Sequence, residues 1–505
     1  MKTIRFTRED LDLFSSASHD RNPLHLSDDY AYRTPYGERV VFGVLDGLTA
    51  LGSAADRPAC GLSSVEFEFF DTALLGVNYS VEATESDLPE STVRVLDGRR
   101  PVLEAVLSFR AGTPRQSWQA AEWQPTLSEP EDLSSAQLMA GQRVRGSYAP
   151  SLRHLEIFCS QAQLKQTWLT HPHVAALMWA SYLVGMELPG KRALFSRLRI
   201  EFQDSTRTVA PFDYEAEITE ISDLGELTIH AILRSGGMAW ATAKIGAHVR
   251  DDLPQVTMAS VESLVGRSQV LAGKVALVTG ASRGLGAAMV RVLALHGATV
   301  VLNFMCSQDQ AEQLRDSLAQ TAGKIILERG DAGSLEWCKD GAKRIAAQFA
   351  RLDFLLCNAS PTLLPLWLEA SAAERVNSFV QRSLAMVSAP MMVFLPMLAA
   401  GNGWNVLVSS SAVTQPHSHF PHYVVGKSAA EALVRAASTE YRSVSSLIIR
   451  PTRLLTDLTN TPFGRRGSLP PECVAASLLK RLLGPPCPGK VEVLDRFSPL
   501  TDDSR

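Results

Sequence analysis

The sequence predicts two copies of an α+β unit followed by an α/β unit built on a parallel sheet. The first two units are indicated by a helical stretch, at residues 38–54 and again at 173–185, that precedes strands of alternating apolar and polar residues. From residue 271 onward, short and continuously apolar strands such as "KVALVTG" alternate with helical stretches. That alternation is typical of a parallel sheet covered by helices on both faces.

The first unit shows its elements in a clear order. Apolar residues from Val40 to Leu51 recur at helical spacing, and the strands "VEFEFF" and "VNYSVEATE" follow. Asp97-Gly98 stands between two apolar runs, which predicts a hairpin. The strands return as "LRIEFQD" and "FDYEAEITE" about 135 residues later. We interpret this recurrence as a duplicated α+β unit.

Composition limits the classes of function. A chain of 505 residues exceeds one compact core, and a net charge of −4 gives no electrostatic footprint for nucleic acid. The seven cysteines are scattered without a C-x-x-C pair, which suits a reducing compartment and offers no zinc site. The first residues lack a signal-peptide core, and the apolar run "AMVSAPMMVFLPMLAA" is too short to span a bilayer. We therefore expect a cytoplasmic protein with no membrane, nucleic-acid or metal partner.

Polar, proline-bearing stretches predict the domain boundaries. The expected segments are a first α+β domain, a linker, a second α+β domain, a second linker and the α/β domain, at residues 1–115, 116–140, 141–250, 251–270 and 271–500.

A glycine-rich loop follows the first strand of the α/β domain. In "VALVTGASRGLG" the residues Gly280, Ser282, Arg283, Gly284, Leu285 and Gly286 lie between a strand and a helical run. A tight turn there brings the backbone close to a pyrophosphate held at the amino terminus of a helix. On its own, the pattern fits a plain glycine-rich turn equally well.

A tyrosine and a lysine further along decide between these two interpretations. Tyr423 and Lys427 in "YVVGK" are one helical turn apart, and Ser410 ends a strand thirteen residues before the tyrosine. An adjacent ammonium lowers the pKa of a phenol, and a serine hydroxyl can steady a carbonyl or alkoxide oxygen. The order of loop, serine, tyrosine and lysine therefore predicts acid–base chemistry beside a nucleotide.

These motifs make residues 271–500 resemble the short-chain dehydrogenase/reductases of the 3-oxoacyl reductase type. The resemblance implies a Rossmann-type doubly wound sheet and hydride transfer between a nicotinamide and a carbonyl or alcohol. It makes Tyr423 the acid–base group and Ser410 the donor that orients the substrate. Lys427 adjusts the pKa of Tyr423 and binds the ribose. Asn358 in "CNAS" takes a structural and cofactor-side role, and Asp331 matches the acid that faces the adenine.

The loop after the second strand indicates the cofactor. That strand ends "VVLNFMCS" without the carboxylate that binds the ribose 2′-hydroxyl of NAD, and Arg283 can meet a 2′-phosphate. We therefore expect NADPH, with Arg283 as a solvated loop residue the alternative. The chain departs from the family at three other places, Ser383 for an asparagine and Ser360 and Thr452 for glycines.

The amino-terminal stretch "SASHDRNPLHL" places Asp20, Asn22, Pro23 and His25 within six residues. One interpretation is an Asx turn with a satisfied loop histidine. The other is an acid and a base that share one water. Such a pair can catalyse the addition or removal of water.

With the helix that follows, this stretch resembles the MaoC-like or (R)-specific enoyl-thioester hydratases of the hotdog superfamily, here as a tandem double hotdog. The resemblance implies Asp20 and His25 as catalytic residues, and Asn22 and Gly43 on the substrate and oxyanion side. Phe42 stands where the family often has histidine. The second copy has no equivalent pair, so we expect a degenerate hotdog and a single site.

Together the resemblances imply a bifunctional enzyme, an NADP-dependent ketoreductase fused to a lyase. It would reduce a 3-oxoacyl thioester and dehydrate the 3-hydroxyacyl product, on acyl carrier protein or coenzyme A, in fatty-acid or polyketide-like biosynthesis. Three alternatives stay open: hydration and oxidation in acyl-chain degradation, a single-activity reductase with a carrier-binding hotdog half, and a non-catalytic scaffold. The reductase resemblance also implies a homodimer.

Overall fold

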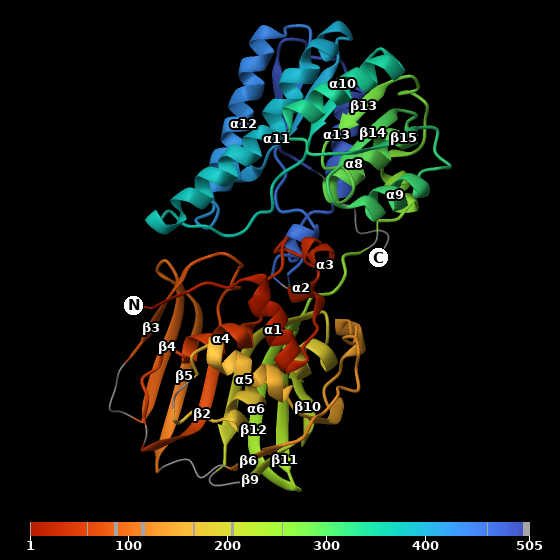
Figure 1. Cartoon of the computed structure of the whole chain (residues 1–505). Coiled ribbons are helices and arrows are strands. Elements are labelled where there is room, and N and C mark those ends of the chain that lie inside the picture. The colour runs from red at the N-terminus through yellow and green to blue at the C-terminus, as the bar shows by residue number, and fades with distance from the viewer. Residues whose placement is uncertain are drawn as a thin grey trace. The chain divides into compact units, whose positions relative to one another are not determined.

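A ten-stranded antiparallel sheet dominates the first half of the chain in the computed structural model (Figure 1). The structure describes residues 2–57, 59–84, 89–112, 117–164, 167–203, 207–254, 256–461 and 463–497. The chain divides into two compact units, Met1–Asp252 with Thr461–Phe463, and the rest of the chain from Leu253 onward. We call them the N-terminal and C-terminal units.

The N-terminal unit contains two runs of helices and strands. Its elements are β1 (Lys2–Ile4), α1 (Arg8–Ser18), α2 (Pro23–Leu26), α3 (Asp28–Tyr32), α4 (Gly43–Leu51), β2 (Cys60–Phe69), β3 (Tyr79–Ala83), β4 (Glu90–Asp97), β5 (Arg100–Ala111), β6 (Ser117–Ala120), η1 (Ser135–Gln137), β7 (Arg143–Tyr148), α5 (Leu152–Gln161), α6 (His171–Tyr182), η2 (Leu183–Glu187), β8 (Ala193–Phe202), β9 (Arg207–Ala210), β10 (Phe212–Ile221), β11 (Glu226–Ser235) and β12 (Met238–Val249).

The large sheet has an internal repeat. Its strand order is β1-β3-β4-β5-β2-β8-β12-β11-β10-β7, so the second five strands repeat the order of the first five outward from the β2–β8 pair. Helix α4 precedes β2 in one half and α6 precedes β8 in the other. Both helices pack into a single hydrophobic core with the sheet. The helix-then-strands order that the sequence indicates is therefore present twice.

Local sequence explains most of these elements and one difference. Asp97 pairs with Arg100 across the predicted hairpin, and Gly98 has a φ of 63°, which the turn requires. Helix α4 begins at Gly43, later than the pattern from Val40 predicts. Val40 instead forms a β-bridge with Leu74, and Phe42, the residue before the helix, has extended backbone dihedrals.

The two segments expected as linkers contain regular structure. Strand β6 pairs in parallel with β9, and the helix α7 (Met258–Val265) packs against neighbouring helices of the C-terminal unit. Val261 is fully buried, which explains why this stretch belongs to the C-terminal unit rather than to a linker. The expected boundary at residues 115 and 116 and the expected end at residue 500 lie outside the described residues.

The C-terminal unit alternates strands and helices. After α7 its elements are β13 (Val275–Val278), α8 (Gly284–Leu295), β14 (Thr299–Phe304), α9 (Gln308–Ser317), β15 (Lys324–Arg329), α10 (Leu335–Phe349), β16 (Phe354–Cys357), η3 (Ala370–Ala372), α11 (Ala373–Ala400), β17 (Trp404–Val408), η4 (Ser411–Val413), α12 (Pro421–Glu440), β18 (Ser445–Ile449), η5 (Asp457–Thr459), α13 (Pro471–Leu482) and β19 (Val491–Leu494).

Its seven strands form a parallel sheet in the order β15-β14-β13-β16-β17-β18-β19. Helices α7, α8 and α13 share one apolar core with the sheet, and α10, α11 and α12 share another, so both faces are covered (Figure 1). The strand order reverses between β13 and β16, the place where doubly wound folds bind ligands. The predicted Rossmann-type parallel sheet is confirmed.

One helix among the described residues, Ala370–Ala400, is long and apolar enough to cross a membrane by length and composition. Its α-helical part is α11, which begins before the apolar run seen in the sequence and contains both prolines of that run, Pro390 and Pro396. Half of its most apolar window is buried inside the protein, and the core helix of a soluble protein meets the same criteria.

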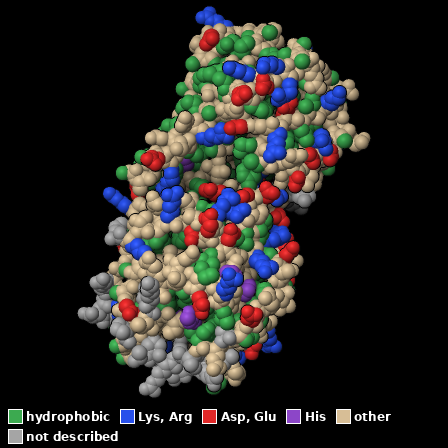
Figure 2. All heavy atoms as spheres, viewed as in Figure 1, with side chains coloured by type: hydrophobic (Ala, Val, Ile, Leu, Met, Phe, Trp, Pro, Cys, Tyr) green, Lys and Arg blue, Asp and Glu red, His purple; other side chains and the backbone are tan. Residues whose placement is uncertain are grey.

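On the face drawn in Figure 2, basic and acidic side chains are intermixed.

Candidate active sites

The Asp20 carboxyl is buried in the N-terminal unit. It lies just after α1 and is 2% exposed. Its Oδ1 accepts the Asn22 backbone N–H at 3.0 Å, and its Oδ2 accepts the Ser181 hydroxyl of α6 at 2.7 Å. Burial raises the pKa of Asp20 to about 7, although both hydrogen bonds act to lower it. A carboxyl group with this pKa can hold a proton near neutral pH.

His25 faces the same pocket with its ring orientation fixed. Nδ1–H donates to the Val40 carbonyl at 2.8 Å, since a carbonyl only accepts, and the ring stacks on Phe42 at 3.8 Å between centroids. Nε2 is thereby left as the ring's acceptor nitrogen. Burial lowers the pKa of His25 to about 4, against the opposing effect of the Val40 hydrogen bond. The imidazole is therefore neutral, and its Nε2 can accept a proton.

Asn22 has a positioning role. Its Oδ1 accepts the Leu24 N–H at 3.0 Å and its Nδ2 donates to the Gly190 carbonyl at 3.3 Å. The expected oxyanion role of Asn22 is therefore not evident, because protein groups engage its amide. The Asx turn is present, yet Asp20 and Asn22 are buried, so the turn and the acid–base interpretation hold together.

A pocket joins these groups. It is partly open to solvent, and its lining includes Asp20, His25, Gly43 and Asp46 from the first half. Ser181 and Gly185 come from the second half. Gly43 is the first residue of α4, whose first amides have no side-chain cap among the described residues. A backbone N–H at this helix start can stabilise a developing oxyanion.

The second half holds Asp20 in place through Gly185. An added Cβ at Gly185 would lie 2.3 Å from Asp20 Oδ1, closer than any real contact, so only glycine fits this point of η2. A π-helical turn such as η2 is frequently found at functional sites. No local signal in the sequence could identify Ser181 or Gly185, because they meet Asp20 only through the fold.

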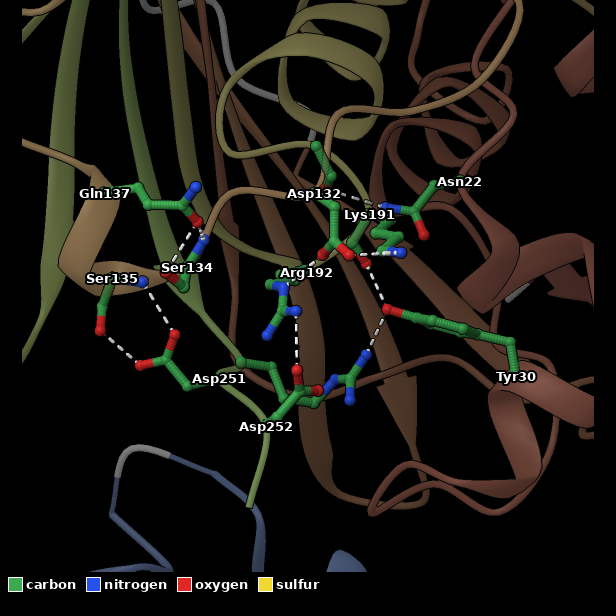
Figure 3. Close-up of polar contacts among 12 residues, drawn as sticks. Asn22, Tyr30, Asp132, Ser134, Ser135, Gln137, Lys191, Arg192, Asp251 and Asp252 are labelled. Carbon is green, nitrogen blue, oxygen red and sulfur yellow. Dashed lines mark hydrogen bonds and ion pairs between the residues drawn. The ribbon is translucent and has the colours of Figure 1, made fainter. Parts of the chain in front are cut away.

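An ion-pair network fixes the loop that supports Asn22 (Figure 3). Lys191 Nζ lies 2.6 Å from Asp132, and Arg192 pairs with both Asp132 and Asp252. The Tyr30 hydroxyl donates to the Lys191 carbonyl at 2.8 Å. The segment around Asp132, expected as linker, therefore helps to hold one wall of the site.

Asp46 is a pocket residue that the sequence reasoning missed. It is 3% exposed, and its Oδ1 has no hydrogen-bond partner within the described chain. Burial raises the pKa of Asp46 to about 7. A lone acid inside the apolar run "VVFGVLDGLTAL" is the signal that could have found it.

In the C-terminal unit the expected serine, tyrosine and lysine meet at the end of β17. The Tyr423 hydroxyl is hydrogen-bonded to Ser410. Lys427 Nζ donates to the Val408 carbonyl at 2.9 Å and lies 5.6 Å from the centre of the Tyr423 ring. Burial raises the pKa of Tyr423 and lowers that of Lys427 to about 8. The expected lowering of the phenol pKa is not found, because burial raises this pKa by more than the Ser410 hydrogen bond lowers it.

The glycine loop has the close packing that a bound dinucleotide requires. Gly280 and Gly284 have φ values of 62° and 55°, and a Cβ at Gly286 would lie 2.3 Å from the Gly280 carbonyl oxygen. Asn358 Nδ2 donates to the Gly280 carbonyl at 2.9 Å and so holds the loop. The twelve-residue helix α8 starts here without a side-chain cap from the described residues. These features fit a pyrophosphate at the helix start.

Other predicted cofactor residues have additional partners. Arg283 donates to Asp457 at 3.0 Å. Asp331 forms a two-bond ion pair with Arg382 of α11, at 2.8 and 2.7 Å, which holds the pKa of Asp331 below its usual range. Ser282 is partly exposed, whereas the Leu285 side chain is buried, so only the backbone of Leu285 can face a ligand.

Ser383, the replacement for the family asparagine, is buried against α12. An added Cβ at Gly426 would lie 3.1 Å from Ser383 Oγ. The serine therefore packs closely beside the turn of helix that contains Tyr423 and Lys427.

The parallel sheet, the glycine loop and the serine–tyrosine–lysine set define a Rossmann-type oxidoreductase. A family model described as short chain dehydrogenase matches residues 274–465. An uncharacterized oxidoreductase of Methylorubrum extorquens is 29% identical over 197 residues, 38% of this chain and 77% of the relative. The 3-oxoacyl-(acyl-carrier-protein) reductase of Escherichia coli is 27% identical over 190 residues, 37% and 76% of the two chains.

Among solved structures, an alcohol dehydrogenase from Thermococcus sibiricus complexed with 5-hydroxy-NADP is similar at 28% identity and a TM-score of 0.39. The match covers 45% of this chain and 96% of that one. The C-terminal unit is a short-chain dehydrogenase/reductase, a member of an oxidoreductase family that uses NAD(P).

Proposed function

We propose that the chain is a bifunctional enzyme of acyl-thioester biosynthesis. Its C-terminal unit reduces a 3-oxoacyl thioester with NADPH, and its N-terminal unit dehydrates the 3-hydroxyacyl product. The observation that carries the second activity is one pocket with an acid of pKa about 7 and a neutral imidazole of pKa about 4. The repeated strand order supports a double hotdog of the MaoC-like type for this unit.

In ketoreduction the Tyr423 phenol is the proton donor. Its raised pKa keeps the phenol protonated, and Ser410, hydrogen-bonded to it, orients the substrate oxygen beside it. NADPH, when bound, supplies a hydride to the carbonyl carbon. The substrate oxygen takes the phenol proton, and the Ser410 hydroxyl, hydrogen-bonded to Tyr423, stabilises the phenolate that remains.

In dehydration His25 and Asp20 act on neighbouring carbons. His25 Nε2 accepts the proton at C2, electrons form the C2–C3 double bond, and the C3 hydroxyl leaves as water with the Asp20 proton. The Gly43 amide stabilises the negative charge that develops on the thioester oxygen. His25 then releases its proton to solvent, and Asp20 takes up a proton from solvent.

Several parts of the proposal rest on the sequence. The choice of NADPH over NAD rests on the missing carboxylate after β14 and on Arg283. The acyl carrier is a carrier protein or coenzyme A. The homodimer and the cytoplasmic location stay predictions.

Product analysis with the full-length chain tests the proposal. We expect 3-oxoacyl thioesters with NADPH to give both hydroxyacyl and enoyl products, detected by mass. The variant H25A should stop at the hydroxyacyl thioester, and Y423F should leave the oxoacyl thioester unreduced. Absence of both products across chain lengths and carriers would defeat the proposal. Hydroxyacyl product without enoyl product in the unmodified chain would leave a single-activity reductase.

A further inference from the structure

The N-terminal pocket contains a carboxyl group that the dehydration chemistry does not use. Asp46 lies on α4 three residues after Gly43, on the same side of the helix and one turn further along. It lines the pocket with Asp20 and His25. Its Oδ1 is buried and has no hydrogen-bond partner in the part of the chain that the structure describes.

Two glycine contacts fix the rotation of this helix. An added Cβ would lie 2.8 Å from Phe69 at Gly43 and 2.6 Å from Phe67 at Gly47, so this side of α4 lies directly on β2. Asp46 lies beside this contact side of α4, one turn beyond Gly43, and lines the pocket together with Gly43.

A plain hydrocarbon chain would be a poor partner for this wall. Burying a carboxyl oxygen without a hydrogen bond costs free energy, and a hydrocarbon group against it would displace water and supply no donor. Tyr36 and Thr72 add further hydroxyl groups to the lining. A site built to bind a substrate hydroxyl discriminates strongly against an analogue that lacks it, because its own polar groups are then left unpaired.

We infer that the N-terminal pocket takes a hydroxylated acyl thioester, and that a hydroxyl group of the acyl chain donates a hydrogen bond to Asp46. This inference rests on the proposed dehydratase function and names its substrate class. Asp46 is a specificity-determining residue, distinct from the acid and base that move protons. The Cβ of a helical residue points toward the helix amino terminus, so the carboxyl lies near the Gly43 end, close to the thioester. A hydroxyl on C4 is therefore the first to test.

The test compares two thioesters that differ by one hydroxyl group. The 505-residue chain is incubated with the N-acetylcysteamine thioester of either trans-2-butenoic acid or 4-hydroxy-trans-2-butenoic acid, and kcat/KM for hydration is measured with each. We expect kcat/KM to favour the hydroxylated substrate at least about tenfold. D46L should reduce this ratio to about one or below, and D46N should retain part of it. T49V, on the same helix and outside the pocket lining, is the matched control and should keep the wild-type ratio.

Binding of unreactive analogues separates this inference from the proposed function. Amides of butanoic and 4-hydroxybutanoic acid with the same cysteamine arm are titrated into wild type and D46L by calorimetry. If neither thioester is hydrated but the hydroxylated amide binds more tightly in an Asp46-dependent way, the function fails and the inference stands. Equal binding of both amides, or an equal loss with both substrates in D46L, would overturn the inference.

Discussion

Asp20 and His25 show how two residues five positions apart acquire opposite roles. Asp20 is buried and His25 is half-buried, and burial disfavours the charged form of each group, which raises the pKa of the acid and lowers that of the base. The Ser181 hydroxyl and the Val40 carbonyl then fix their orientation. The environment therefore gives a proton donor and a proton acceptor at the same pH.

This pair predicts the pH dependence of dehydration. The reaction needs protonated Asp20, so we expect kcat/KM to be level between about pH 4 and about pH 7 and to fall about tenfold per unit above pH 7. Initial rates with a 3-hydroxyacyl thioester in buffers of constant ionic strength check this profile. A rate that rises through pH 7 would mean that Asp20 acts as the base.

A second prediction at the residue scale concerns Tyr423. Because the phenol is the only proton donor that the mechanism assigns to ketoreduction, Y423F should lower kcat by at least about 100-fold. Binding of NADPH, followed by fluorescence, should persist. Y441F, at the end of the same helix, is the matched control and should keep wild-type kcat. Wild-type kcat in Y423F would exclude the phenol as the acid.

At the scale of elements, the π-helical turn η2 positions Asp20. G185A places a methyl group 2.3 Å from Asp20 Oδ1, so the carboxyl must move. We expect dehydration to fall about 100-fold, since a displacement of about 1 Å can cost that much, while ketoreduction stays unchanged. Rates of the two steps, assayed separately, measure both effects. G341A, a helical glycine with only ordinary contacts around its added Cβ, should change neither rate.

The pair of Arg283 in the glycine loop and Asp457 in η5 predicts the cofactor preference. R283A should raise KM for NADPH about tenfold or more and leave KM for NADH unchanged, because only NADPH carries the 2′-phosphate. D457N removes the competing carboxylate and should lower KM for NADPH. Equal effects of R283A on KM for both cofactors would mean that Arg283 is only a solvated loop residue and does not bind the 2′-phosphate.

Elements whose pattern is local could be predicted from the sequence, and those set by distant contacts could not. The Asp97-Gly98 hairpin and the parallel strands show a period or turn within a few residues. The extended chain at Val40 depends on a bridge to Leu74, and β6 depends on its pairing with β9. Motif residues such as Asp20 and Tyr423 could be found because their spacing is fixed, whereas Ser181 reaches the pocket only through the duplication.

At the scale of the whole molecule, each unit has its own hydrophobic interior. Residues up to Val249 form one apolar cluster, and two further clusters cover the faces of the parallel sheet. Separate cores allow the two units to unfold independently. We therefore expect two transitions in calorimetry of the full-length chain.

NADPH should then stabilise one transition only. A ligand that binds the native state at about 100 times its Kd adds about 2.7 kcal/mol, and the proposed cofactor residues, from Gly280 to Lys427, all lie in the C-terminal unit. We expect saturating NADPH to raise the unfolding temperature of that unit by several degrees and to leave the other transition in place. Inorganic phosphate at equal ionic strength is the control. A shift of both transitions together would mean that the two cores unfold as one, and no shift at all would contradict cofactor binding by the glycine loop.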